Sequence, residues 1–376
     1  MPRGTFSVFS IALLLYALTR AAPTPYNEHV VEADALVHGH VWVENPPDHE
    51  YVENRGRKYL LHPPLSAIVL MPLSAVFGLR LDQTVVCVIL GALNVALAWR
   101  LFTILELAAE TRAWLTAFFA LGTVMWFEAT LGAAWGFALV LSCAPTLLAL
   151  SEAFGRRRPI LLGLWMGLAA LARYDLVLAW PIYALLQRRE KNWRAWPWLA
   201  LGALPAVAIY LAWSYARFAG FADQALWRWY ELDSYGYLQH PGGPFNLRNL
   251  PFNLYTALFM APAFSDRPPW IHPTFMGQAL VFTSPALILC LRARDRRAAL
   301  MWLATGFVMI PPLTVYANGF SQFGARYWIQ ALPFLLVLMA IGVRNAVDQE
   351  ARILIVLSIL LVSYGMWHIR TIGFGG

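Results

Sequence analysis

The stretch "GRKYLLHPPLSAIVLMPLSAVFG", residues 56–78, decides how the rest of the chain crosses a membrane. It begins with basic and aromatic residues, passes through His62-Pro63-Pro64, and is apolar from Leu65 to Phe77. That apolar run has 13 residues and contains Pro72, whereas a helix that spans a bilayer needs about 20 apolar residues. The stretch therefore predicts a helix that lies at the membrane face instead of crossing it.

The composition around this stretch excludes an ordinary soluble protein. Of the 376 residues, 59% are hydrophobic and 13% are charged, while a soluble domain carries about 25% charged residues. The apolar residues recur in blocks, so we expect one all-α polytopic membrane domain over 1–376, with about eleven transmembrane helices within a range of nine to thirteen. The blocks lie near 5–21, 82–105, 112–128, 131–153, 159–173, 175–187, 195–216, 275–291, 298–316, 327–343 and 352–369.

The basic residues give the orientation, because cytoplasmic loops carry an excess of Lys and Arg. With a cytoplasmic N-terminus and a non-spanning 64–78, the inside receives 16 of the 28 basic residues and the outside 14 of the 21 acidic ones. A spanning 64–78 would move the densest basic clusters outside. The segments 23–81 and 217–274 are then extracytoplasmic loop regions with short interfacial helices. An uncleaved first helix explains the N-terminus more simply than a signal peptide does.

The first long segment concentrates acidic and histidine residues. Seven carboxylates lie between Glu28 and Glu53, and Glu28 and Glu32 have helical spacing, so we expect a short helix near 26–39. A carboxylate near the membrane face can act as a general base on an acceptor hydroxyl; the alternative is a solvated acidic loop. Mixed carboxylates and imidazoles also leave a bound divalent cation open, although no compact ligand motif stands out and we assign no metal ligand.

Cationic residues near the same face could hold a phosphate. They are Arg57, Lys58 and His62 of the opening stretch, Arg173 of "LARYD", and Arg326 at the start of a helix. The alternatives are contact with lipid headgroups, an ion pair between Arg173 and its neighbouring aspartate, and a plain interfacial anchor.

Aromatic and amide side chains in the second segment suggest a sugar, because sugars show both C–H faces and hydroxyl groups to their binding sites. The segment 217–274 is therefore the expected substrate-binding region, and 23–81 the expected catalytic region. As substrate-binding side chains we single out Tyr59, Tyr235, His240 and Tyr327.

Several elements, in their order along the chain, resemble a known family. After a first apolar helix come "ADAL", "YLLHPPL" and "MPLSAVFG", and later "GLWMGLAALARYD" and "SQFGARYWIQALPFLLVLMAIG". This order is similar to that of the GT-C superfamily of membrane glycosyltransferases. It is closest to their bacterial family-39-like branch, which is related to protein O-mannosyltransferases.

The resemblance implies an inverting glycosyltransferase in the bacterial inner (plasma) membrane. The donor would be a polyprenyl-phosphate sugar, and the acceptor a glycan, a lipid or a protein; no nucleic acid and no certain cofactor is implied. Such enzymes take their base from an Asp-Glu pair just after the first helix, where this chain has Asn27 and Glu28. Glu28, Asp34 or Asp48 is then the expected catalytic base. The cations named above would hold the donor phosphate, and the stretch 62–65 would form a floor under the donor.

Two other classes remain as alternatives. A transporter or flippase of a polar lipid or sugar would place ionisable residues at mid-membrane, where most of these spans carry none. A non-catalytic membrane scaffold would explain why Asn27 stands where an acid is expected.

Overall fold

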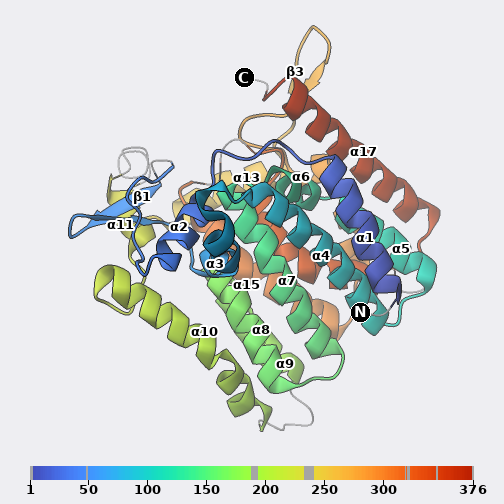
Figure 1. Cartoon of the computed structure of the whole chain (residues 1–376). Helices are drawn as coiled ribbons and strands as arrows, with labels where there is room; N and C mark the ends of the chain where they lie inside the picture. The colour runs from blue at the N-terminus through green and yellow to red at the C-terminus, as the bar shows by residue number, and fades with distance from the viewer. Residues whose placement is uncertain are drawn as a thin grey trace.

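The computed structural model describes residues 3–47, 50–187, 194–232, 241–317, 319, 322–343 and 346–374, which form a helical bundle (Figure 1). The α-helices are α1 Arg3–Leu18, α2 Glu28–Val37, α3 Leu65–Phe77, α4 Gln83–Ile104, α5 Ala109–Leu121, α6 Val124–Leu131, α7 Ala134–Phe154, α8 Pro159–Ala172, α9 Trp180–Gln187, α10 Ala195–Phe218, α11 Ala225–Leu232, α13 Leu250–Leu258, α14 Leu280–Thr283, α15 Arg296–Thr314, α16 Leu332–Gly342 and α17 Gln349–Thr371. The 3₁₀ helices are η1 Gly78–Arg80, η2 Tyr174–Ala179, η3 Leu247–Asn249, η4 Pro285–Arg292 and η5 Arg326–Ala331.

The expected polytopic all-α membrane fold is confirmed, whereas the count of eleven spans is not. Each of the eleven apolar blocks carries helix, but several are short or partly 3₁₀. Within the described residues, five helices are long and apolar enough to cross a membrane, namely α4, α7, α10, α15 and α17. A sixth span is formed if α5 and α6, which meet at a bend of 50°, count as one.

Helix ends and close contacts follow from particular residues. Asp82 accepts hydrogen bonds from the amides of Thr84 and Val85 at 2.9 and 3.3 Å, and so begins α4. In the tight contact between α8 and α10, a Cβ atom on Gly163 or Gly202 would lie 2.0 Å from a backbone oxygen of the other helix. Glycine at both positions lets the two backbones approach closely, as small residues do in membrane bundles.

The opening stretch forms α3, with the predicted length and position. Leu65–Phe77 is followed by the short η1, and the pair is too short to be one of the candidate spans. The helix packs against α2, beside which it lies at one end of the bundle (Figure 1). We call this end, which carries 23–81 and 217–274, the loop end.

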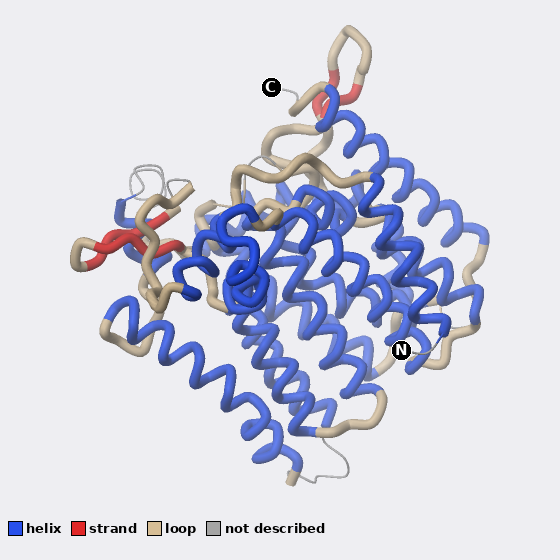
Figure 2. Tube along the Cα trace, in the orientation of Figure 1, coloured by secondary structure: helices blue, strands red, loops and turns tan. Residues whose placement is uncertain are grey.

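Two small antiparallel hairpins at the loop end were not predicted (Figure 2). One pairs β1 (Tyr51–Asn54) with β2 (Arg57–Leu60), and the other pairs β3 (Ala263–Phe264) with β4 (Ile271–His272). The turn of the first has positive φ at both Arg55 (55°) and Gly56 (71°). Such a turn matches the twist of a hairpin, and glycine adopts it without strain.

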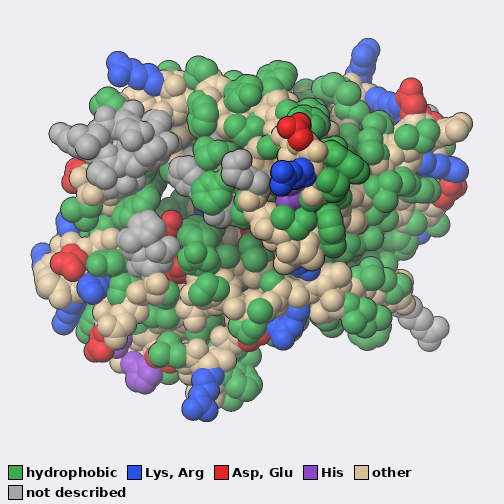
Figure 3. Space-filling model, turned by 90° about the horizontal axis from the view of Figure 1, so that it is seen from above, with side chains coloured by type: hydrophobic (Ala, Val, Ile, Leu, Met, Phe, Trp, Pro, Cys, Tyr) green, Lys and Arg blue, Asp and Glu red, His purple; other side chains and the backbone are tan. Residues whose placement is uncertain are grey.

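Figure 3 looks onto the loop end. Hydrophobic side chains cover much of this face, and acidic and basic side chains gather at its left rim, on the side where β1 and α11 lie in Figure 1. The charged side chains of Glu28, Glu32 and Arg217 do not lie at this rim but are buried.

Candidate active site

The N-terminal half of α2 presents two buried carboxylates. Glu28 and Glu32 are one helical turn apart, and each is 1% exposed. Burial raises the pKa of Glu32 to about 8; the charge of Arg217 opposes this rise, and those of Asp223 and Glu28 add to it. Glu32 is therefore mostly protonated at neutral pH.

Two neutral imidazoles lie beside these carboxylates. The rings of His29 and His62 are 4.5 Å apart, and His29 donates through Nε2 to the backbone oxygen of Ala134 at 2.9 Å. Burial lowers the pKa of His29 to about 4. Burial, followed by the charges of His29, Arg173 and Arg217, places the pKa of His62 well below its usual value. The buried Nε2 of His62 has no hydrogen-bond partner among the described residues, so it can still bind a substrate atom.

A buried arginine anchors this region. Arg217, at the end of α10, is 1% exposed and pairs with Asp223 at 3.2 Å. It also donates to the backbone oxygen of Leu60, at the end of β2. Tyr174 donates to the same Asp223 carboxylate at 2.9 Å. Asp223 offsets the charge of Arg217. Through these contacts Arg217 and Asp223 connect the β1–β2 hairpin, α10 and η2.

Two further guanidinium groups approach one aromatic ring. Arg173 lies 5.5 Å and Arg326 5.7 Å from the ring centre of Tyr327. Arg173 is bonded to Asp175 at 3.1 Å, but its buried Nε lacks a hydrogen-bond partner within the described ranges. Arg326 is 7% exposed and stands 5.3 Å from the ring of Trp135. Both guanidinium groups therefore lie near the ring of Tyr327.

A loop of the first long segment is fixed across this region. Trp135 donates from its indole N–H to Glu50 at 2.7 Å, and its ring lies 4.8 Å from that of Tyr26. The start of α7 thus holds both ends of the loop that contains α2.

An apolar cavity of about 330 Å³ lies next to the charged cluster. It is enclosed by α8, η2, the start of α9 and α10. Two tyrosines line it and also reach Asp223: Tyr174 through the bond described above, and Tyr210 by accepting from the Asp223 amide at 3.2 Å. The cavity is therefore apolar along most of its wall and borders the charged groups at one side. Its lining is Met166, Gly167, Ala170, Leu171, Tyr174, Leu176, Val177, Trp180, Ala203, Ala206, Val207 and Tyr210.

Five of the residues predicted from the sequence come together here. Glu28 raises the pKa of its neighbour Glu32, the charge of Arg173 acts on His62, and Tyr327 joins Arg173 to Arg326.

Three other predicted residues lie elsewhere, whereas the ring of Tyr59 lies 5.9 Å from the guanidinium group of Arg217. Asp34 is near Ser74, whose hydroxyl is 3.5 Å from its carboxylate. Arg57 stacks on Trp42 at 3.7 Å and Lys58 lies 5.1 Å from the ring of Tyr51, both on the β1–β2 hairpin. Tyr59 is buried against Phe218, at 5.8 Å between ring centres. The predicted Asp48, Tyr235 and His240 lie outside the described residues.

Sequence reasoning did not select Glu32, His29, Arg217 or Asp223. For Glu32 a signal existed, because it follows Glu28 by one helical turn. Arg217 stands alone at the end of an apolar block, where an interfacial anchor is the ordinary interpretation. As for metals, the described part of the chain contains no group of three or more His, Cys, Asp or Glu side chains that could hold an ion.

No family model and no curated protein matches this sequence. Solved structures do match: ArnT from Cupriavidus metallidurans bound to undecaprenyl phosphate superposes with a TM-score of 0.56 at 14% identity, over 97% of this chain. The fold is that of ArnT. The apo form of the same protein gives a TM-score of 0.51 at 15% identity over 91% of this chain.

At these identities the likeness confirms the expected fold and does not extend to the superfamily. The finer resemblance to the family-39-like branch stays a prediction. This chain spans 64% and 60% of the length of the two ArnT chains.

Proposed function

We propose that this protein transfers a sugar from a polyprenyl-phosphate donor to an acceptor hydroxyl. The observation that carries the proposal is the apolar cavity between α8 and α10, which borders a buried cluster of cations and carboxylates. A lipid phosphate needs both parts, an apolar channel for its isoprene units and fixed cations for its head. ArnT, which has the same fold, is bound to undecaprenyl phosphate in one of its structures.

The proposed reaction uses three groups of the site. The carboxylate of Glu28 takes the proton of the acceptor hydroxyl, whose oxygen forms a bond to the anomeric carbon of the sugar. The bond from that carbon to the phosphate oxygen breaks, and its electron pair leaves with the lipid phosphate. Arg173 and Arg326 offset the negative charge that grows on the leaving phosphate. Attack from the face opposite the leaving group inverts the anomeric carbon.

The surrounding residues support this division of roles. Glu32 is mostly protonated at neutral pH, so beside Glu28 it adds little further negative charge near the donor phosphate. Neutral His62, with its buried Nε2 available, can hold a sugar hydroxyl or a phosphate oxygen. The orientation derived from the basic residues puts this chemistry on the outer side of a bacterial inner membrane, with the N-terminus in the cytoplasm.

The test is transfer by the purified protein in lipid nanodiscs. Radiolabelled undecaprenyl-phosphate sugars are mixed with a cell-envelope extract as the source of acceptor, and the label that leaves the lipid is counted. We expect transfer from at least one donor, and loss of transfer in Glu28→Gln but not in Asp34→Asn, the matched change on the same helix. Transfer that persists in Glu28→Gln removes the proposed base. Movement of intact donor across the bilayer without release of the sugar would instead support a flippase.

A further inference from the structure

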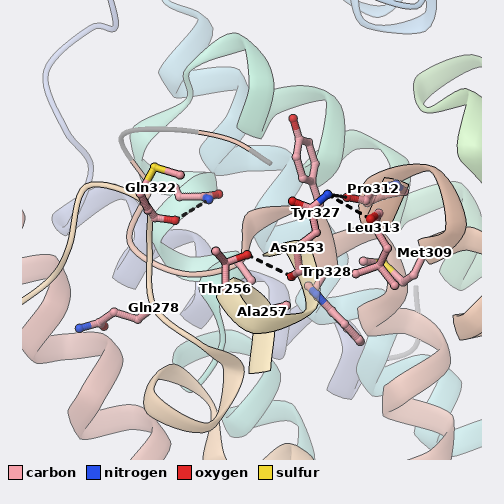
Figure 4. A pocket seen from close by; sticks show the side chains of 12 residues that line it. Asn253, Thr256, Ala257, Gln278, Met309, Pro312, Leu313, Gln322, Tyr327 and Trp328 are labelled. Atoms are coloured by element: carbon pink, nitrogen blue, oxygen red, sulfur yellow. Dashed lines mark hydrogen bonds between the residues drawn. The ribbon is translucent and has the colours of Figure 1, made fainter. Parts of the chain in front are cut away.

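A second, smaller pocket is separate from the apolar cavity between α8 and α10 (Figure 4). Its polar wall comes from Asn253 and Thr256 of α13, from Gln278, and from Gln322 in the segment before η5. Tyr327 lines this pocket and is also the ring near which Arg173 and Arg326 lie. The pocket is therefore next to the proposed phosphate position but distinct from the apolar cavity.

The amide of Asn253 is fixed in one orientation. Its nitrogen donates to the backbone oxygens of Leu313 and Val315 at 3.0 and 2.8 Å, at the end of α15. The last carbonyl oxygens of a helix have no donor within the helix, so a side chain such as Asn253 can satisfy them. Figure 4 shows the amide nitrogen turned toward Pro312 and Leu313.

The oxygen of the same amide is left as an acceptor. Asn253 is 3% exposed, and its Oδ1 has no hydrogen-bond partner in the part of the chain that the structure describes. A buried acceptor without a partner destabilises the fold, so a ligand that donates a hydrogen bond there would be favoured.

The pocket also limits the size and charge of its ligand. Its volume is about 20 Å³, enough for a group of about the size of a water molecule, such as a hydroxyl, but not for a sugar ring. Its described lining has amide, hydroxyl and apolar side chains, the last including Ala257 and Met309, and no carboxylate. An ammonium group would find no counter-ion there and would lie near Arg326. A neutral donor group fits better.

We propose that this pocket receives an uncharged hydroxyl group of the transferred sugar, at the ring position where an amino sugar carries its ammonium group. The pocket then selects neutral sugars over amino sugars. The inference rests on the proposed function, because the sugar reaches the pocket only when its phosphate lies between Arg173 and Arg326.

The experiment measures binding of four lipids to the full chain in nanodiscs. They are undecaprenyl phosphate alone and its conjugates with glucose, N-acetylglucosamine and glucosamine. We expect at least one neutral sugar lipid to bind roughly tenfold or more tightly than the protonated glucosamine lipid. Equal binding of the neutral and amino sugar lipids would overturn the inference without any variant.

Two variants locate the selection. Ala257→Leu fills the pocket, and Asn253→Ala removes the acceptor; thermal unfolding checks that each variant is folded. We expect both to lower the affinity for neutral sugar lipids roughly tenfold while leaving bare undecaprenyl phosphate unchanged. Unchanged affinity for neutral sugar lipids in folded Ala257→Leu would contradict the inference alone. If none of the four lipids binds the wild type, the proposed function fails as well.

Discussion

The first long segment contains two charged regions that differ in one respect. On α2, Glu28 and Glu32 are buried and their environment changes their protonation. On the β1–β2 hairpin, Arg57 is exposed and rests on the ring of Trp42, while Lys58 rests on that of Tyr51. Both regions looked equally suited to chemistry in the sequence. The comparison shows that burial beside opposite charges, and not the density of charge along the chain, marks the candidate site.

The largest expected effect comes from replacing one carboxylate on each face of α2 by its amide. We expect Glu28→Gln to lower the transfer rate about 10²- to 10⁴-fold, the usual range for loss of a general base. Asp34→Asn, on the other face of the helix, should change the rate less than about twofold, because the Asp34 carboxylate lies near Ser74 of α3 and His38. The rates of label release for the two variants check this. A large loss in Asp34→Asn would move the base to the opposite face.

Replacing the cations of the candidate site and of the hairpin gives the same comparison, with a smaller expected effect on lipid binding. Arg326→Ala and Arg173→Ala should each weaken binding of undecaprenyl phosphate roughly 10- to 100-fold, since charge-assisted hydrogen bonds to phosphate contribute about 1.5–3 kcal/mol each. Arg57→Ala on the hairpin should leave binding nearly unchanged. Titration of the lipid into nanodisc samples measures all three. A larger loss in Arg57→Ala would instead place the phosphate at the hairpin.

Much of this arrangement could be predicted from the sequence. The apolar blocks place helix at all eleven expected segments, because helix in a membrane requires continuous apolar residues. The length of the apolar run at 65–77 likewise predicted a helix too short to be a candidate span, since 13 apolar residues are too few. The i, i+4 spacing of Glu28 and Glu32 was enough to expect a short helix at α2.

The rest could not be predicted, because it depends on contacts between distant segments. Arg217 meets Asp223 and Leu60 only when α10 and the β1–β2 hairpin pack together. Whether Arg57 or Arg173 is available to a phosphate likewise depends on which aromatic ring and carboxylate each one meets. The turn of the hairpin depends on two residues with positive φ, Arg55 and Gly56. Two residues within a polar segment are a weak indication of such a turn in the sequence.

The apolar cavity allows a third test, with a moderate effect. Ala170→Trp places a large ring in the cavity and should weaken binding of undecaprenyl phosphate roughly tenfold, because the isoprene chain loses buried apolar contact. Leu204→Trp, on the outer surface of the adjoining α10 where Leu204 is 53% exposed, is the matched control. Equal affinity of the two variants would show that the lipid chain lies elsewhere.

The smallest expected effect is on the pH dependence of stability, which tests the protonation of Glu32 on α2. The folded state keeps Glu32 protonated up to about pH 8, while the unfolded state releases this proton near pH 4.5. The unfolded state thus binds fewer protons in this window, so stability falls as pH rises from about 4.5 to about 8. Glu32→Gln should remove this part of the loss of stability. The fall in Tm between pH 5.5 and 8.5 should then be a few degrees smaller in the variant than in the wild type. Thermal unfolding at several pH values tests this, and parallel curves for variant and wild type would contradict the assigned protonation.

The most direct test of the central claim is an experimental structure of the protein with undecaprenyl phosphate. The account predicts density for the phosphate within hydrogen-bond distance of Arg173 and Arg326, and for the first isoprene units in the cavity between α8 and α10. A phosphate bound to Arg57 and Lys58 on the hairpin, with the cavity between α8 and α10 empty, would contradict it.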